Sequence, residues 1–288
     1  MKFKNIKKRK FKKMLLTSAF LISLTVLIWY SFIFEPNNIQ IEKINIEIEN
    51  LPESFNNTKI VHLTDFHSYN FGEREKKVLE ILEDINPDFV FITGDFIDHK
   101  TKDISSCQEF WSELGNRYQG KVYSVLGNHE YWIDHIDANS IKRLLEKSGI
   151  VVLSNENEKI FQDNEYIYLL GVNDPHTGND DLGVAAADTE KDIPKILLAH
   201  SPDIVNDLEN LEKEKIDLIL AGHTHGGQFV IPFIQPYWTP TKNHGKYASG
   251  LFKIGNAYLY VNRGIGMAVL PIRFNCPPEI AVIELRGR

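Results

Sequence analysis

Cysteine is scarce in this sequence, with two residues among 288, Cys107 and Cys276. Two cysteines cannot form a disulfide framework, and neither lies in the Cys-x-x-Cys spacing of a structural zinc site. We therefore expect both to be buried free thiols. With 43% hydrophobic residues, the chain has enough apolar side chains for one sizeable core, so the fold does not need covalent cross-links.

Acidic residues are absent from the first thirteen positions, which contain eight Lys and Arg residues. The other 275 residues carry 24 basic against 39 acidic side chains, a net charge of −15. A body this acidic repels the phosphate backbone of DNA or RNA, so we expect no nucleic-acid partner.

Charge of either sign is absent from residues 14–34, MLLTSAFLISLTVLIWYSFIF. A helix of this length spans ~31 Å, which matches the hydrocarbon core of a bilayer. The alternatives are a buried helix of a soluble domain and a cleaved signal peptide, but no small-x-small cleavage site follows the run. Lysines precede it, and Trp29, Tyr30, Phe32 and Phe34 end it. We predict an uncleaved, single-pass anchor in the cell membrane, with the amino terminus cytoplasmic and the body extracytoplasmic.

Strand-like and helix-like stretches alternate along the body. Apolar runs such as KIVHLTD (59–65), DFVFITGD (88–95) and DLILAGH (217–223) have the length of buried strands. Stretches of helical period, such as REKKVLEILEDI (74–85), lie between them. This alternation predicts an α/β fold with a largely parallel sheet. The late runs AYLYVN and EIAVIEL have no helix between them, which predicts a more antiparallel sheet edge.

Composition and pattern together divide the chain into four parts. We predict a basic cytoplasmic tail at 1–13, a transmembrane anchor at 14–34, a linker with a first strand at 35–56, and one domain at 57–288. The first strand is indicated by EKINIEIEN, in which apolar and polar side chains alternate.

Residues that can bind metal ions follow five of the predicted strands. Because sites in open α/β sheets form at the carboxyl ends of strands, we expect these side chains to converge on one crevice. The candidate ligands are Asp65, His67, Asp95, Asn128, His200, His223 and His225. A carboxylate can bridge two cations through its two oxygens, and mixed oxygen and nitrogen donors suit Mn²⁺, Zn²⁺ or Fe. The set therefore predicts two divalent ions, which could together clamp a phosphoryl group.

The order of these motifs resembles that of the calcineurin-like metallophosphoesterases. The family signature runs DxH, GDxxD, GNHE, a lone His and GHxH, and all five parts occur here in order. The anchor, the form GHTHGGQ and the ending RGIGMAVLPIRFNCPPEI resemble the membrane-anchored bacterial subgroup. The resemblance implies a four-layer α/β/β/α sandwich over roughly residues 57–285, with a dimetal site at one end of the sheets.

The resemblance also implies roles for the site residues. One ion would be held by Asp65, His67, Asp95 and His225, and the other by Asp95, Asn128, His200 and His223, with Asp95 bridging the two. The two catalytic candidates are His129, which would protonate the leaving oxygen as a general acid, and Asp98, which would orient it. Arg263 and Arg273 are candidates for binding phosphate.

Other polar residues have plainer interpretations. We expect Glu130 to support the site or cap a helix, and His62, on the face opposite Asp65, to be a sheet residue. The remaining histidines lack ligand partners in the sequence and are expected at the surface or rim, namely His99, His135, His176 and His244. The uncharged stretch 228–238 is either core or an apolar lip, formed by Phe233 and Trp238, for a lipid-bearing substrate.

These patterns predict a dimetal phosphoesterase that hydrolyses phosphodiester or pyrophosphate bonds by attack of a metal-bound hydroxide. Protein phosphatases of this superfamily resemble GDxVDRG where this chain has GDFIDHK, so the arginine is missing and monoesters are disfavoured. The subgroup resemblance suggests a lipid-linked or envelope substrate. The alternatives are a non-catalytic, membrane-anchored metal-binding scaffold and an envelope interaction protein with a vestigial site, and both expect lost ligands.

Overall fold

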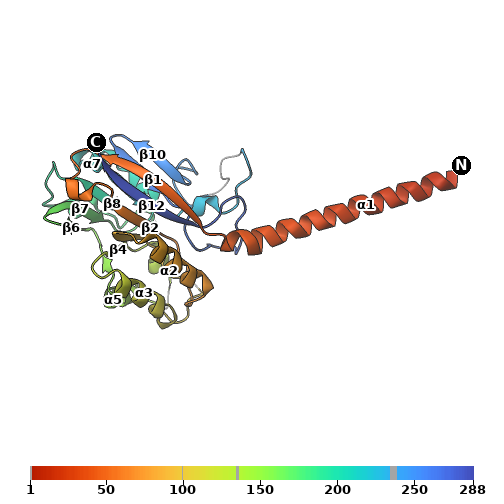
Figure 1. Ribbon diagram of the computed structural model, residues 1–288, viewed down its shortest axis with the longest axis horizontal. Helices are drawn as coiled ribbons and strands as arrows, with labels where there is room; N and C mark the ends of the chain where they lie inside the picture. Colours follow the sequence, from red (N-terminus) through yellow and green to blue (C-terminus); the bar gives the residue numbers. More distant parts are fainter. Residues whose placement is uncertain (1, 99, 134–135, 234–238) are drawn as a thin grey trace.

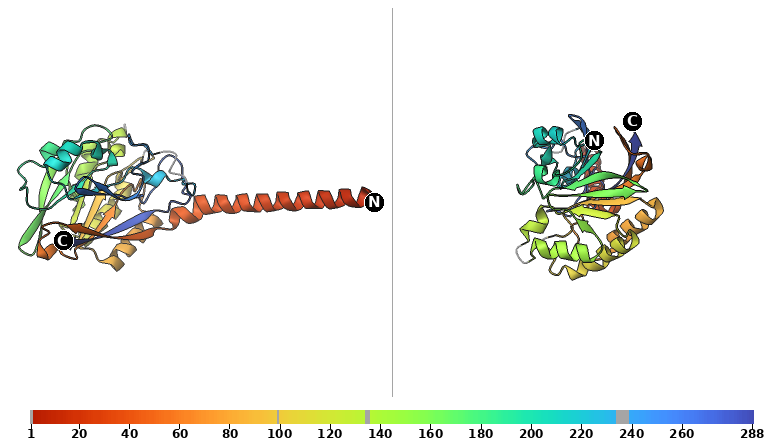
Figure 2. Two further views of the ribbon diagram at one scale, coloured as in Figure 1. Left: turned by 90° about the horizontal axis from the view of Figure 1, so that it is seen from above. Right: turned by 90° about the vertical axis from the view of Figure 1, so that its left-hand side faces the viewer.

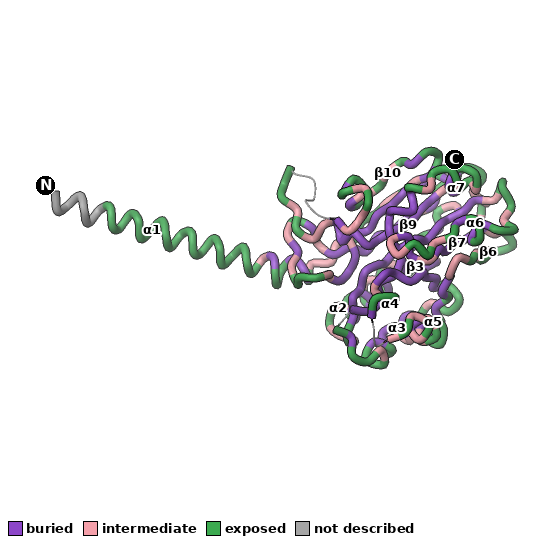
Figure 3. Tube along the Cα trace, turned by 180° about the vertical axis from the view of Figure 1, so that it is seen from behind, coloured by how far each residue is buried: buried purple, intermediate pink, exposed green. Residues whose placement is uncertain are grey.

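The computed structural model describes residues 2–98, 100–133, 136–233 and 239–288, and consists of a long helix projecting from a body of two sheets (Figure 1). The helix α1 (Lys2–Trp29) continues into a π-helical turn, Tyr30–Phe34, and a 3-10 turn, Glu35–Asn37. Among the described residues, α1 is the one helix long and apolar enough to cross a membrane. Its side chains are exposed from Arg9 to Trp29 (Figure 3), so it is not a core helix.

The first sheet has six strands in the order β1-β12-β2-β3-β4-β5. Strands β2, β3, β4 and β5 run parallel, while β12 pairs antiparallel with β2 and parallel with β1. Strand β1 lies in the predicted linker region and pairs with β12, so the predicted first strand is confirmed. The bounds are β1 (Gln40–Ile48), β2 (Lys59–Leu63), β3 (Phe89–Thr93), β4 (Val122–Val125), β5 (Val151–Val152) and β12 (Glu279–Gly287).

The second sheet also has six strands, in the order β10-β11-β9-β8-β7-β6. Its centre is parallel, and an antiparallel pair closes each edge, β6 with β7 and β10 with β11. The bounds are β6 (Glu156–Gln162), β7 (Glu165–Gly171), β8 (Lys195–Leu198), β9 (Leu218–Ala221), β10 (Gly250–Ile254) and β11 (Ala257–Val261). The predicted parallel centre is confirmed. Of the two late runs, AYLYVN forms β11 beside the antiparallel edge strand β10, as predicted, whereas EIAVIEL forms β12, which lies between β1 and β2 in the first sheet.

Helices cover the outer face of each sheet, which gives four layers (Figure 2). The helices are α2 (Glu73–Ile85), α3 (Ser105–Arg117), α4 (Asn128–Trp132), α5 (Ala138–Lys147), α6 (Leu182–Ala185) and α7 (Leu208–Lys213). Apolar residues of α2, α3 and α5 pack on the first sheet, those of α6 and α7 pack on the second, and a third core lies between the sheets. The α/β/β/α sandwich is confirmed.

The layer order explains why the strands read as continuous apolar runs. Strand β3 is buried on both faces, because the first sheet lies between helices and the second sheet. The helices that the sequence did not predict, α4, α6 and α7, have four to six residues each. Segments this short are formed by tertiary contacts and show no helical periodicity.

An aromatic cluster lies directly beneath the strand ends that carry the candidate ligands. The ring of Trp111, on α3, lies 4.9 Å from the rings of both Phe66 and Phe96. Phe66 and Phe96 are fully buried and each follows an aspartate of the predicted site in sequence. Helix α3 therefore supports the turns that position Asp65 and Asp95.

We expect Trp111→Ala to lower the free energy of unfolding by ~3–5 kcal/mol, because it leaves a cavity under both turns. The measurement is guanidinium denaturation of the full chain in detergent, followed by circular dichroism. The control is Trp132→Ala, at a position that is 55% exposed, where we expect a change within ~0.5 kcal/mol. Equal midpoints for the two variants would contradict the supporting role of α3.

Candidate metal centre

The backbone turns sharply at the strand ends that carry the predicted ligands. Five of these residues have positive φ angles, a conformation that costs non-glycine residues ~1–3 kcal/mol each. They are Asp65 (51°), His67 (45°), Asp95 (53°), His223 (69°) and His225 (50°). Such strain persists only where the surrounding structure compensates for it, and it concentrates at functional sites. The turns aim side chains from both sheets into one space between the strand ends.

The first group of ligand atoms comes from the ends of β2, β3 and β9. The Nε2 atoms of His67 and His225 lie 3.0 Å apart, and His225 Nε2 lies 3.4 Å from Asp65 Oδ1. The other carboxylate, Asp95, has its Oδ2 atom 3.5 Å from His67 Nε2. All these residues are buried. The donor atoms of Asp65, His67 and His225 are close enough together to hold one cation, and Asp95 adjoins this group through His67.

The second group comes from the ends of β3, β4, β8 and β9. His200 Nε2 lies 3.0 Å from Asn128 Oδ1, 3.1 Å from His223 Nδ1 and 3.3 Å from Asp95 Oδ2. Three of these side chains, Asp95, His200 and His223, form a group that could hold a metal ion. The amide oxygen of Asn128 adds a fourth donor. Asp95 is thus common to both groups, as a bridging carboxylate would be.

Hydrogen bonds from neighbouring residues hold these ligands in place. The carboxylate of Glu130 accepts the backbone N–H groups of Asp95 (3.0 Å), Phe96 (2.9 Å) and Gly127 (2.7 Å), so it braces the β3 and β4 turns together. The ring of His200 contacts the Thr93 carbonyl through Nδ1 at 2.6 Å, which leaves Nε2 for the site. Such outer contacts fix the orientation of metal ligands. The supporting role expected for Glu130 is confirmed.

Burial keeps two of the imidazoles neutral and opposes the charged form of Asp65. Removal from water lowers the pKa of His67 and of His223 to about 3, so both rings offer a lone pair at neutral pH. Burial raises the pKa of Asp65 to about 7, and the charge of Asp95 adds to the rise. Two carboxylates, an amide and four imidazoles fit a pair of divalent cations, which would relieve this repulsion.

His129 lies at the edge of this centre, where a ring nitrogen is close enough to donor atoms of His67 and Asp95 to form a third group that could hold a metal ion. Its ring meets the His67 ring edge-on at 4.5 Å and lies 5.9 Å from the Trp132 ring. The side chain is half-buried, while its backbone N–H donates to Asp95 Oδ1 at 3.0 Å. His129 therefore combines access to solvent with proximity to both ligand groups.

Asp98 is buried beside the first ligand group. Its Oδ2 atom lies 3.7 Å from His67 Nδ1, and its Oδ1 atom accepts the Lys100 N–H at 2.9 Å. The structure thus places Asp98 behind a candidate ligand, His67, a contact that the sequence did not predict. Orientation of His129 by Asp98 stays a prediction.

The two arginines expected to bind phosphate have other partners. Arg273 is fully buried and donates to the backbone carbonyls of Arg263, Gly264, Gly266 and Cys276. Arg263 forms ion pairs with Glu279 at 2.7 Å and Glu42 at 2.8 Å. Their guanidinium donors are therefore used inside the fold, which argues against the predicted phosphate-binding role. The sequence does not predict these contacts, because the partners are backbone carbonyls and acidic residues far away in the chain.

Two further residues lie at the rim of the centre. The His176 ring lies 4.7 Å from the His223 ring, which agrees with the rim position expected for it. Asp174 is fully buried, and its carboxylate accepts the backbone N–H of His176 at 3.1 Å. The sequence reasoning missed Asp174, although it follows β7 as the other site residues follow their strands.

The other expectations have mixed outcomes. His62 is buried in β2 and contacts Thr93 Oγ1 at 2.8 Å, which confirms it as a sheet residue. His244 is exposed, and Cys107 and Cys276 are buried free thiols, as expected. His99, His135 and Trp238 lie outside the described residues. Phe233 is fully exposed, so it does not pack in the core.

Close approach of the β4 turn to the ligands requires glycine at position 127. A Cβ atom there would lie 2.3 Å from Asp95 Oδ1 and 2.8 Å from His200 Cε1. We expect Gly127→Ala to displace the bridging carboxylate and lower the bound metal from two ions per chain to fewer than about one. Plasma mass spectrometry of the purified chain measures this. The control, Gly287→Ala, meets open space, and full metal content in both variants would contradict the geometry.

Comparisons with known proteins agree with this geometry. The family described as calcineurin-like phosphoesterase matches residues 58–227. The uncharacterized metallophosphoesterase YkuE of Bacillus subtilis is 30% identical over 268 residues, which cover 90% of this chain and 89% of that protein. The phosphodiesterase YaeI of Escherichia coli is 29% identical, over 79% of this chain and 82% of its own. A Danio rerio transmembrane protein with a metallophosphoesterase domain is 29% identical, over 92% of this chain and 62% of its own.

The match to the family covers more than half of the chain and includes every predicted ligand. The dimetal centre typical of the family agrees with the His and Asp groups found at the strand ends. The exposed apolar helix α1 and the transmembrane relative suggest that the protein is anchored in a membrane. The chain belongs to the calcineurin-like phosphoesterase family and is a metal-dependent phosphoric ester hydrolase.

Proposed function

We propose that this phosphoesterase hydrolyses phosphodiester or pyrophosphate bonds at a centre of two divalent ions. The observation that carries the proposal is the position of Asp95 Oδ2, 3.5 Å from His67 Nε2 and 3.3 Å from His200 Nε2. One carboxylate oxygen within reach of both imidazole groups suits a shared ligand. The alternative of a non-catalytic scaffold expects missing ligands, whereas both groups here are complete.

The donor set favours Mn²⁺, Zn²⁺ or Fe, because imidazole nitrogens are combined with carboxylate and amide oxygens. When bound, two such ions would polarise phosphoryl oxygens and lower the pKa of a water molecule to near neutrality. The chain supplies the rest of the chemistry. Asp65 and His67 would hold one ion, and Asn128 and His223 would hold the other.

The preference for diesters follows from the charge of the substrate. A phosphomonoester dianion needs more positive charge than a diester, and the two candidate arginines are engaged by Glu42, Glu279 and backbone carbonyls. The similarity to the E. coli phosphodiesterase supports the same preference.

His129 is proposed as the general acid that protonates the leaving oxygen. Its half-buried ring at the edge of the centre allows it to face a substrate. The family resemblance implies that it acts on the substrate and is not a metal ligand. A leaving group whose conjugate acid has a high pKa would depend on this proton more than one whose conjugate acid has a low pKa. Asp98 is proposed to support it, as the family resemblance implies.

We expect His129→Ala to lower kcat for bis-aryl phosphates by ~10²–10⁴. The loss should be larger where the phenol that leaves has a higher pKa. The measurement is steady-state hydrolysis in the presence of Mn²⁺, over a graded series of leaving groups. The metal content should stay at two ions per chain, unlike that of His225→Ala. The exposed His244→Ala serves as control. A loss that is equal for all leaving groups would contradict the role of proton donor.

The substrate is proposed to carry a lipid. Phe229, Ile231 and Phe233 are exposed and follow the last ligand, His225, within eight residues. Apolar side chains in this position offer a surface for acyl chains beside the reacting phosphate.

The basic residues that precede the apolar run 14–34 support a cytoplasmic amino terminus, with the catalytic domain on the outer side of the membrane.

We expect Phe233→Ser to lower kcat/KM for a lipid-linked pyrophosphate by ~10-fold, the equivalent of one lost aromatic contact. Hydrolysis of a water-soluble bis-aryl phosphate should stay unchanged, because the substitution lies outside the metal centre. The matched control is Phe161→Ser, on β6, where the side chain is 60% exposed. Equal losses on both substrates would exclude the lipid-binding role.

A further inference from the structure

The end of the apolar helix is docked on the catalytic domain. Although α1 is exposed, Ser31 and Glu35 in the turns that follow it are almost fully buried. The Ser31 carbonyl accepts the backbone N–H of Arg273 at 3.0 Å. The Tyr30 ring meets the Phe274 ring edge-on at 6.1 Å. The helix therefore has defined contacts with the domain and is not joined to it by a free linker.

Glu35 provides a polar link at this junction. Its carboxylate accepts the backbone N–H groups of Asn275, at 2.9 Å, and of Cys276. Charged hydrogen bonds in a buried setting are among the stronger ones in proteins. Residues 273–276 are thereby attached to the first turns after α1, and the orientation of the domain relative to the helix is set.

Five exposed apolar residues lie on the two segments that adjoin residues 273–276, and we call them the anchor-side patch. They are Phe229 (46% exposed), Ile231 (50%), Phe233 (108%), Val269 (75%) and Leu270 (61%). The segments that carry them, 228–233 and 264–272, contain no charged residue. They are joined by the hydrogen bonds of Gln228 with Ala268, at 3.0 and 2.6 Å.

The patch is continuous with the membrane helix. The Phe229 ring stacks on Phe274 at 5.0 Å, and Phe274 in turn contacts Tyr30. Figure 1 shows α1 leaving the domain on this side, opposite the carboxyl terminus. A cluster of exposed apolar side chains beside a membrane-spanning helix would lie at the depth of the lipid headgroups and upper acyl chains.

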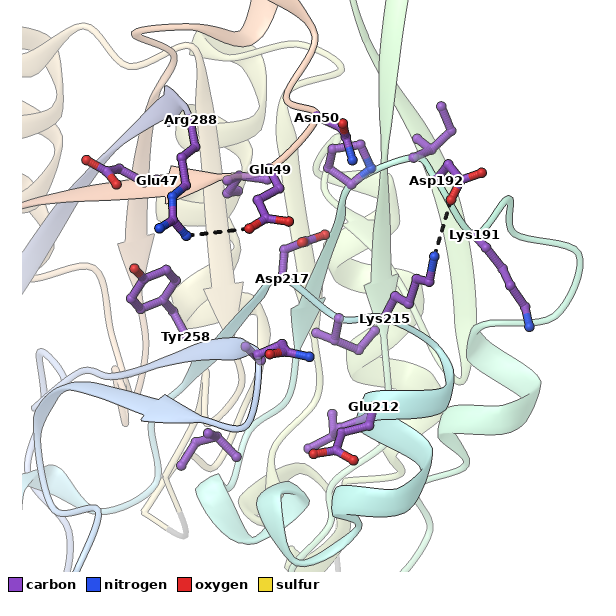
Figure 4. A pocket seen from close by; sticks show the side chains of 18 of the residues that line it. Glu47, Glu49, Asn50, Lys191, Asp192, Glu212, Lys215, Asp217, Tyr258 and Arg288 are labelled. Atoms are coloured by element: carbon purple, nitrogen blue, oxygen red, sulfur yellow. Dashed lines mark hydrogen bonds and ion pairs between the residues drawn. The ribbon is translucent and has the colours of Figure 1, made fainter.

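The other end of the domain has a different character. A cavity of about 430 Å³ lies there, at the amino ends of β8, β9 and β11 (Figure 4). Charged side chains line it, with ion pairs between Arg288 and Glu49 at 3.4 Å and between Lys215 and Asp192 at 3.2 Å. This end of the domain is polar and faces water, whereas the end from which α1 leaves is apolar.

We propose that the anchor-side patch inserts into the leaflet from which α1 emerges, so that the domain rests on the membrane surface. The second segment also borders the metal centre, because Gly266 donates its N–H to the Asp65 carbonyl at 2.6 Å and Ile265 donates to Thr64 at 3.1 Å. The centre is thereby held close to the bilayer at a fixed orientation. The proposal concerns the position of the domain and does not depend on which phosphate ester is hydrolysed.

The test places an environment-sensitive fluorophore on single introduced cysteines of the full chain in phosphatidylcholine and phosphatidylglycerol liposomes. Val269→Cys probes the patch, and Phe161→Cys, on β6 away from α1 (Figure 1), is the matched exposed control. Cys107 and Cys276 are buried, so the unsubstituted chain gives the labelling background. We expect iodide to quench the label at 269 about fivefold less than at 161, and doxyl lipids to quench only the former.

A second variant tests the link through Glu35. Glu35→Ala should keep the protein in the membrane but raise iodide quenching at position 269 toward that at 161, because the domain is no longer held against the lipid. Glu47→Ala, at an exposed position on β1, should change neither value. If iodide quenches the labels at 269 and 161 equally in the variants that retain Glu35, the proposal is overturned, whatever the enzyme activity.

Discussion

The shared carboxylate of Asp95 is the group on which the rest of the site depends. Its Oδ2 atom faces His67 from the first sheet and His200 from the second, while its Oδ1 atom is held by the His129 N–H. A carboxylate between two imidazole groups requires both sheets to end at the same place. The packing of the two sheets, the turns and the glycines can all be understood as means of meeting that requirement.

The cost of this arrangement is visible in the backbone and in the buried polar groups. Five candidate ligands adopt positive φ angles, and burial raises the pKa of Asp65. Compensation comes from the apolar core between the sheets and from the aromatic cluster around Trp111. Glu130 adds to it by binding three consecutive N–H groups of the β3 turn and one of the β4 turn. A rigid scaffold thus maintains a strained site, as is common in enzymes.

The anchor is part of the same structural unit as the catalytic centre. Residues 264–272 contact Asp65 and Thr64 at one end, and the residues that follow them contact Ser31 and Glu35 at the other. Movement of the helix relative to the domain would therefore disturb the wall of the metal centre. This arrangement explains why a single chain segment, rich in glycine and apolar residues, serves both the site and the junction with α1.

The sequence by itself determined the fold class and singled out the candidate ligands that the structure brings together. Strand length, strand–helix alternation and a ligand at each strand end are local features, and the parallel arrangement makes those ends meet. The tertiary structure alone decided what each polar group contacts. Arg273 turns inward to backbone carbonyls, Asp98 lies behind His67, and Glu35 binds N–H groups 240 and 241 residues away. These partners are brought together by chain packing, which leaves no periodic trace in the sequence, so no local pattern could have revealed them.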